Sequence, residues 1–116
     1  MITSSVQRQE IWLVNLDPPG KGREIHKTRP ALVISHDDFN NSPADLVIIL
    51  PITSTDLRIP AHIRVDPPEG GVRKASFIKC DQIRSVSKER LLKRWGRVSN
   101  RTMTTVGSAV RILLDL

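Results

Sequence analysis

Aromatic residues and cysteine are scarce in this sequence. Its 116 residues include two Trp, two Phe, no Tyr and one cysteine, Cys80. So few rings do not provide a broad platform on which single-stranded nucleic acid could stack. A lone cysteine cannot form a disulfide within the chain, which is typical of proteins from a reducing compartment, so we expect a cytoplasmic protein.

Metal-ligand clusters and long apolar runs are also missing. His26, His36 and His62 are too widely separated for metal-site spacing, and we expect neither a metal nor another cofactor. No stretch approaches the ~18 apolar residues that a membrane-spanning helix needs, and residues 1–8 lack the apolar core of a signal peptide. The chain has no repeat or linker, so we expect one domain over residues 1–116 that contacts no membrane.

Positive charge is in excess. The chain has 18 Lys and Arg against 12 Asp and Glu, a net charge of +6. The segment from Arg73 to Arg101 contains ten Lys or Arg and only two acidic residues, Asp81 and Glu89. A small domain with this charge predicts a polyanionic partner such as nucleic acid, held mostly by charge and hydrogen bonds. The alternative is a solvated basic face that only aids solubility.

Short apolar or alternating segments predict a mainly β protein. We expect strands at residues 10–16, 31–36, 46–50, 61–66, 76–81 and 91–98. The run Leu46–Leu50 is apolar without alternation, which indicates a strand buried on both faces. Pro30 fits only at the start of the second strand, because proline cannot donate a ladder hydrogen bond.

The C-terminal segment has a helical period instead. Ser99 is a suitable N-cap for this helix. One helical face gathers four apolar residues, Met103, Val106, Val110 and Leu113. Many short strands with no helices between them, followed by one terminal helix, favour a small β-barrel over a doubly wound α/β fold.

Three expected strand ends carry polar clusters. They lie in the loop at residues 22–30, at residues 50–54 and at residues 79–84. Polar residues on a loop held by a strand are well placed to act on a ligand. We therefore expect the three clusters to converge on one site.

Several motifs occur in a fixed order along the chain. They are Glu10-Ile11-Trp12-Leu13-Val14, Asp17-Pro18, Gly22-x-Glu24, Thr28-Arg29-Pro30, Pro51-Ile52-Thr53-Ser54, Cys80-Asp81-Gln82-Ile83-Arg84, Arg90-Leu91 and Gly96-Arg97. In this order the chain resembles, from about residue 9 to its end, the MazF/PemK (Kid) family of toxin endoribonucleases from type II toxin–antitoxin modules. The resemblance implies an SH3-like β-barrel related to CcdB that works as a homodimer. It also implies an mRNA interferase that cuts single-stranded RNA without a metal and is neutralised by a cognate antitoxin.

The same resemblance implies functional residues. Arg29 and Thr53 match the catalytic pair of the MazF branch. Asp81 matches a residue implicated in the Kid branch, whose other two positions are Lys79 and Arg23 here. The loop Ile25-His26-Lys27 departs from the Gln and Gly residues usual in relatives.

Metal-free RNA cleavage uses the neighbouring 2′-hydroxyl as nucleophile and leaves a 2′,3′-cyclic phosphate and a 5′-hydroxyl. Arg29 is suited to stabilise the phosphoryl charge, and Thr53 to bind a phosphoryl oxygen or orient Arg29. His26 is either a proton-transfer group or an exposed loop residue. Asp81 is either a base or a structural partner of Arg84 or Arg29.

Other residues complete the predicted site. The predicted RNA-binding residues are Arg23, Lys27, Ser54, Lys79, Gln82 and Arg84. Trp95 is assigned to the core or the dimer interface rather than to stacking. Cys80 is expected mid-strand as a small buried side chain.

Two other functions are open to such a chain. One is a CcdB-like poison of DNA gyrase, which depends on a C-terminal Trp-Gly-Ile, whereas this sequence ends Leu114-Asp115-Leu116. The other is a catalytically silent homologue that binds RNA or antitoxin. The presence of both Arg29 and Thr53 favours an active enzyme.

Overall fold

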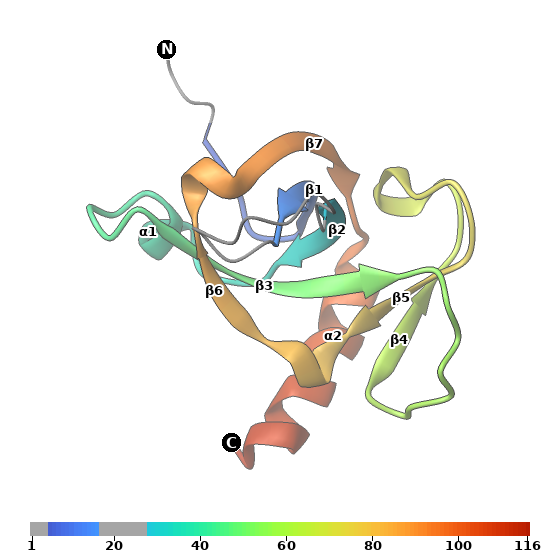
Figure 1. The fold of residues 1–116 in the computed structure, drawn as a ribbon. Coiled ribbons are helices and arrows are strands. Elements are labelled where there is room, and N and C mark those ends of the chain that lie inside the picture. Colours follow the sequence, from blue (N-terminus) through green and yellow to red (C-terminus); the bar gives the residue numbers. More distant parts are fainter. Residues whose placement is uncertain (1–4, 17–27) are drawn as a thin grey trace, which may run out of the picture.

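The structure is a computed structural model that describes residues 5–16 and 28–116, and these residues form a seven-stranded antiparallel sheet with one long helix (Figure 1). The strands are β1 (Glu10–Asn15), β2 (Thr28–Val33), β3 (Leu46–Thr53), β4 (His62–Val65), β5 (Ser76–Lys79), β6 (Arg84–Ser87) and β7 (Leu91–Arg97). The α-helices are α1 (Asp37–Asn40) and α2 (Asn100–Leu114). Three 3-10 turns are η1 (Glu69–Gly71), η2 (Cys80–Gln82) and η3 (Lys88–Arg90).

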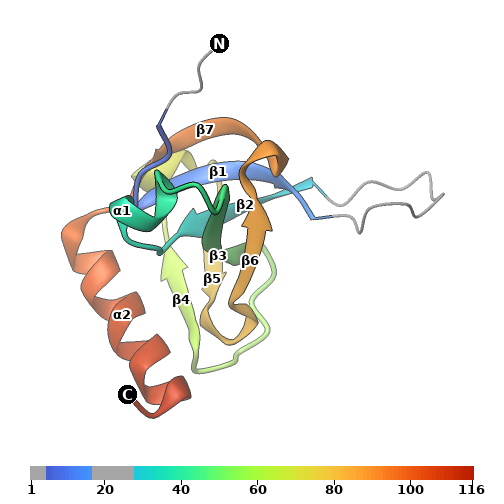
Figure 2. The same ribbon diagram turned by 90° about the vertical axis from the view of Figure 1, so that its left-hand side faces the viewer.

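The sheet curls strongly but does not close. Its strand order is β4-β5-β3-β2-β1-β7, and β6 pairs with the first half of β3 (Figure 2). Within the described residues, the two end strands β7 and β4 do not pair with each other, so the sheet does not close into a barrel. The predicted mainly β fold with a C-terminal helix is confirmed, and the sheet is open rather than a closed barrel.

One expected strand has different bounds in the structure, and one strand was missed. The second strand runs from Thr28 to Val33 and not from 31 to 36, so Pro30 is its third residue. Proline is tolerated there because the β2–β3 ladder begins only at Ala31, which leaves Pro30 paired with β1 alone. The strand β6 was not expected at all, because its sequence Arg-Ser-Val-Ser carries one buried apolar residue and gives no pattern.

Two hydrophobic cores lie on the two faces of β3. Leu50 and Ile52 belong to the core that the sheet forms with α2, whereas Val47 and Ile49 belong to the second core. These four side chains are between 0 and 2% exposed. The prediction of a strand buried on both faces is thus confirmed.

The helix α2 begins where the sequence places its cap. The hydroxyl of Ser99 accepts a hydrogen bond from the Thr102 backbone N–H at 3.1 Å. Glu69 Oε2 also accepts hydrogen bonds from the Ser99 backbone N–H at 2.9 Å and from the Thr102 hydroxyl at 2.6 Å. Burial raises the pKa of Glu69, but these hydrogen bonds outweigh it, so the pKa lies below its ordinary value.

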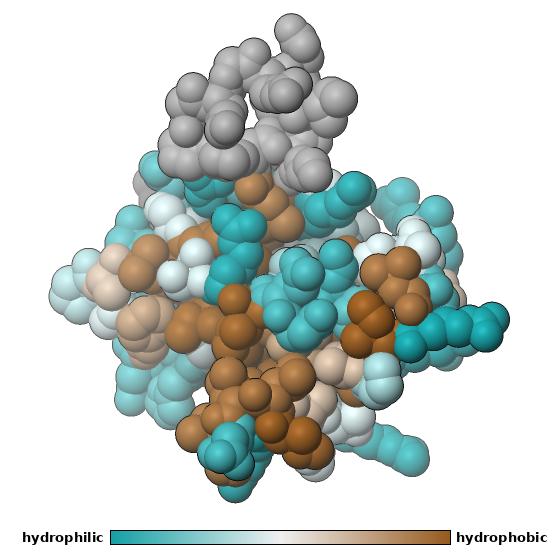
Figure 3. Space-filling view, turned by 60° about the horizontal axis from the view of Figure 1, so that its bottom comes forward, coloured by the Kyte–Doolittle hydropathy of each residue, from teal (hydrophilic) through white to brown (hydrophobic). Residues whose placement is uncertain are grey.

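The end of α2 leaves the core. Met103 and Val106 are buried as expected, but Leu113 is 45% exposed because the last turn extends past the sheet. Ile112 and Leu116 are 80% and 79% exposed, and Figure 3 shows apolar surface gathered on this side of the molecule. None of the described helices is long and apolar enough to cross a membrane.

Candidate functional site

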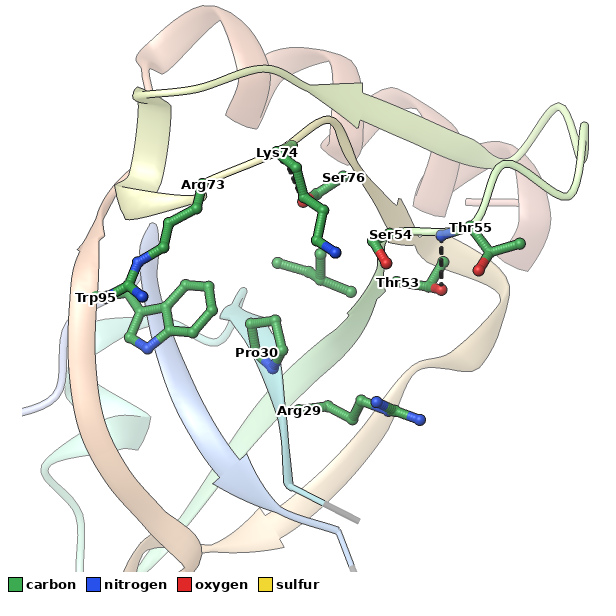
Figure 4. Close-up of a pocket in the computed structure, with 10 residues that line it drawn as sticks. Arg29, Pro30, Thr53, Ser54, Thr55, Arg73, Lys74, Ser76 and Trp95 are labelled. Carbon is green, nitrogen blue, oxygen red and sulfur yellow. Dashed lines mark hydrogen bonds between the residues drawn. The ribbon is translucent and has the colours of Figure 1, made fainter.

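A pocket of about 380 Å³ lies where β2 and β3 leave their common ladder (Figure 4). Four segments supply its walls: β2, the end of β3 with the turn after it, the stretch from η1 to the first residue of β5, and β7. The lining residues are Arg29, Pro30, Ile52, Thr53, Ser54, Thr55, Arg73, Lys74, Ser76 and Trp95. The pocket is therefore assembled from parts of the chain that are far apart in sequence.

Arg29 and Thr53 lie together in this pocket. The β2–β3 ladder ends at Ala31 opposite Pro51, and Arg29 and Thr53 each lie two residues beyond this pair. Both side chains then project from one face of the sheet, because residues two apart in a strand share a face. The structure brings together the two residues that the sequence predicts to be the catalytic pair.

The hydroxyl of Thr53 is held by the turn that follows β3. Its oxygen accepts a hydrogen bond from the backbone N–H of Thr55 at 3.1 Å. A hydroxyl has one proton to donate as well as two lone pairs, so this bond fixes the oxygen and leaves the proton available. Ser54, a predicted RNA-binding residue, is exposed on the same turn and also lines the pocket.

The lining of the pocket is cationic. It includes Arg29, Arg73 and Lys74 but no carboxylate. The ion pairs recorded among residues 5–16 and 28–116 involve none of these three cations. A phosphate group entering the pocket would therefore meet three positive charges that no described acidic residue neutralises.

The third predicted cluster does not reach this pocket. Lys79, Asp81, Gln82 and Arg84 are absent from its lining, and residues 22–27 of the first cluster lie outside the described residues, so the convergence of the three clusters stays a prediction. After β5 the chain turns through η2, which packs against α2, β3 and β4 without lining the pocket.

Asp81 has a partner that the sequence did not indicate. Its Oδ1 is 2.9 Å from Nε2 of His62, whose side chain is only 3% exposed. Neither Arg84 nor Arg29, the two partners expected for a structural Asp81, forms this contact. A catalytic role for Asp81 stays a prediction.

The remaining predicted residues are placed as follows. Gln82 and Arg84 are exposed, and Lys79 is half-buried opposite His62 in the β4–β5 pairing. Arg23, His26 and Lys27 lie outside the described residues. Among the described residues, no group of three or more His, Cys, Asp and Glu is arranged to hold a metal ion.

Cys80 is buried as predicted, but it is the first residue of η2 and not a mid-strand residue. Burial, and to a lesser degree the nearby Asp81 carboxylate, raises the pKa of its thiol to about 11. A thiol with this pKa stays protonated at neutral pH and is a poor nucleophile.

Sequence reasoning missed part of the pocket. Arg73 and Lys74 begin the basic segment but belong to no motif, and nothing in the sequence connects them with Arg29. Trp95 was assigned to the core or a dimer interface. In the structure it is half-buried, packs against the core shared with α2 and also lines the pocket.

Known proteins resemble this chain along almost its whole length. A family model for the PemK-like, MazF-like toxin of type II toxin–antitoxin systems matches residues 7–114. Endoribonuclease MazF9 of Mycobacterium tuberculosis is 34% identical over 116 residues, with 96% of this chain and 98% of that protein covered. Endoribonuclease PemK of Escherichia coli is 36% identical over 105 residues, with 89% and 77% covered.

A solved structure has the same fold. It is an endoribonuclease in complex with its cognate antitoxin from a mycobacterial species, and it superposes with a TM-score of 0.76 at 20% identity. The superposition covers 98% of this chain and 97% of that one.

Proposed function

This chain belongs to the PemK-like, MazF-like toxin family of type II toxin–antitoxin systems, and on that premise we propose that it cleaves single-stranded RNA in the pocket that holds Arg29 and Thr53. The resemblance predicted from the sequence motifs is confirmed, and the names of the relatives support an endoribonuclease. The observation that carries the assignment of the site is that Arg29 and Thr53 both line one pocket without carboxylates, just beyond the end of the β2–β3 ladder.

The proposed reaction is an internal transesterification. The 2′-oxygen attacks the adjacent phosphorus, the bond from phosphorus to the 5′-oxygen breaks, and the products are a 2′,3′-cyclic phosphate and a 5′-hydroxyl. DNA lacks the 2′-hydroxyl and is not a substrate. The guanidinium of Arg29 donates to the non-bridging oxygens as negative charge builds up on them, and the free proton of Thr53 donates to one of the same oxygens.

Two protons must move in this reaction, one off the 2′-oxygen and one onto the 5′-oxygen. The described lining of the pocket contains no imidazole or carboxylate to move them. We therefore assign proton transfer to something outside this lining, which is His26, Asp81 or a water molecule. His26 is the first candidate because its ordinary pKa suits acid–base work near neutral pH.

A toxin of this type is proposed to be neutralised by an antitoxin protein in the cytoplasm. A structure with the same fold is named as a complex with its cognate antitoxin. The cationic pocket favours an antitoxin segment that is acidic, and such a segment would compete with RNA for the same charges.

The predicted homodimer stays a proposal. Exposed apolar side chains at the end of α2, including Ile112 and Leu116, are the kind of surface that a second copy would cover (Figure 3). Sedimentation at micromolar concentration tests it, and a fully active monomer would contradict it.

The test of RNA cleavage uses purified protein and a long RNA of mixed sequence in EDTA. We expect discrete fragments whose 5′-hydroxyl ends accept a kinase label without prior phosphatase treatment. Arg101→Gln is the matched control, because Arg101 is an exposed cation that does not line the pocket. Intact RNA, fragments with 5′-phosphates, or activity that appears only with Mg²⁺ would contradict the proposal.

A further inference from the structure

The two ends of the pocket differ in chemistry. Figure 4 shows the hydroxyl residues Thr53, Ser54 and Thr55 at one end, and Trp95 with Arg73 at the other. The ring of Pro30 lies between the two ends. One end offers donors for a phosphate, whereas the other offers a flat aromatic surface beside a planar cation.

The backbone around Trp95 is held by close packing. A Cβ atom added to Gly71 would lie 2.4 Å from the carbonyl oxygen of Trp95, and one added to Gly96 would lie 2.7 Å from the carbonyl carbon of Gly70. The segment at Gly70 and Gly71 therefore lies directly against β7, and only glycine permits this distance. Because Trp95 also packs against the core, its indole is fixed before any ligand arrives.

Arg73 follows Gly71 by two residues, so the same contact positions it beside Trp95. Its side chain is exposed, runs toward the indole in Figure 4, and forms no ion pair recorded among the described residues. A guanidinium plane stacks on aromatic rings and on bases, and it remains charged at every physiological pH. Arg73 is thus free to close over a flat group that rests on Trp95.

We propose that Trp95 and Arg73 hold one unstacked base of the RNA while its neighbouring phosphate lies at Arg29 and Thr53. This inference rests on the proposed function and adds a base-binding subsite to it. Proteins that read single-stranded RNA commonly stack splayed bases on aromatic rings or Arg planes. The scarcity of aromatic residues fits a single stacking position, not a platform.

The binding test uses Trp12→Phe as the background, which leaves Trp95 as the lone tryptophan. The probe is an oligonucleotide with the cut site mapped in the mixed RNA and a 2′-deoxy nucleotide at the scissile position. We expect the probe to quench Trp95 fluorescence on binding. Filter binding measures the variants that lack Trp95: Trp95→Phe should retain binding within about threefold, whereas Trp95→Leu should weaken it by about tenfold or more, as loss of one stacked base does.

Cleavage kinetics in the wild-type background give a second readout. Trp95→Leu should raise KM more than it lowers kcat and should relax the preference for one base beside the cut. Arg73→Gln should do the same, and Arg73→Lys should keep the salt dependence of binding without restoring the preference, because lysine has charge but no plane. Melting curves show whether each variant is folded. If Trp95→Leu does not fold, Arg73→Gln still tests the subsite, because Arg73 is exposed and its replacement does not disturb the core.

The two proposals fail in different ways. A wild-type protein that leaves RNA intact contradicts the proposed function, and this subsite with it. Cleavage by wild type together with an unchanged KM and cut pattern in Trp95→Leu and Arg73→Gln contradicts the subsite alone.

Discussion

Thr53 accepts a hydrogen bond from the backbone N–H of Thr55 at 3.1 Å, and this bond fixes the hydroxyl oxygen in the same pocket as Arg29. Thr53→Val keeps the shape of the side chain but removes the donor. We expect it to lower kcat by about 10²–10³, the usual cost of one donor to a developing charge. Thr53→Ser keeps the hydroxyl and should stay within about tenfold of wild type in a steady-state assay. Equal activity of the Val and Ser variants would remove Thr53 from the reaction.

Arg29 gives a prediction about geometry as well as charge. Arg29→Ala should lose about 10² or more in kcat/KM, because the charge on the phosphoryl oxygens is no longer stabilised. Arg29→Lys should recover only part of this loss, since a point charge does not reproduce two parallel donors. The measurement is single-turnover cleavage with melting curves as the folding control. A folded Arg29→Ala that cuts within about threefold of wild type would refute the assignment.

Lys74 should act through charge alone. Loss of one phosphate contact to single-stranded RNA lowers the slope of log K against log salt by about 0.7. Lys74→Gln should therefore flatten the slope by this amount and weaken binding of all RNA sequences alike, in filter-binding titrations from low to high salt. Arg101→Gln, remote from the pocket, should leave the slope unchanged. A Lys74→Gln slope equal to that of wild type would show that Lys74 contacts no phosphate.

Glu69 links stability to acid. Hydrogen bonds from Thr102 and Ser99 lower the pKa of Glu69 in the folded state. The contribution of this carboxylate to the free energy of unfolding is therefore complete above the ordinary pKa of 4.5 and is lost as the pH falls below that value. Glu69→Gln should lower the stability at pH 7 by about 1 kcal/mol, or about 4 °C in Tm. The difference from wild type should shrink by pH 3. Glu89→Gln, an exposed carboxylate on η3, is the matched control and should change neither value.

Cys80 links stability to alkaline pH in the opposite sense. The pKa of this thiol in the folded state is raised to about 11. Its contribution to the free energy of unfolding is therefore complete below the ordinary pKa of 9.0 and is lost as the pH rises toward 11. At pH 8 the buried, protonated thiol should react with a disulfide reagent at least tenfold more slowly than the thiol of the urea-unfolded chain. Equal rates for the native and unfolded chains would show that the thiol is accessible and ionised in the fold.

The parts of the fold that were predicted correctly have local causes. The unbroken apolar run of β3 and the cap residue Ser99 each determine structure within a few neighbouring residues, so the sequence shows them directly. Arg29 and Thr53 were found because they belong to motifs. Their meeting in one pocket follows from the pairing of β2 with β3, which no short segment specifies.

The parts that were missed depend on contacts between distant segments. Trp95 and Arg73 become neighbours only because Gly71 lies against β7, and Asp81 meets His62 only because η2 turns toward β4. No period or motif marks such contacts. The strand β6 escaped for a different reason, since a single buried Val86 between polar residues is not a pattern.

The position of β3 determines how the molecule loses its structure. Val47 and Ile49 fill one core, Leu50 and Ile52 fill the other, and Thr53 at the end of the strand belongs to the pocket. Neither core can assemble around an absent β3, so disruption of either one releases the strand from both. The described residues should therefore unfold in one cooperative transition. Catalytic activity and the folded state then share one denaturation midpoint, and no partly unfolded form retains a working nuclease.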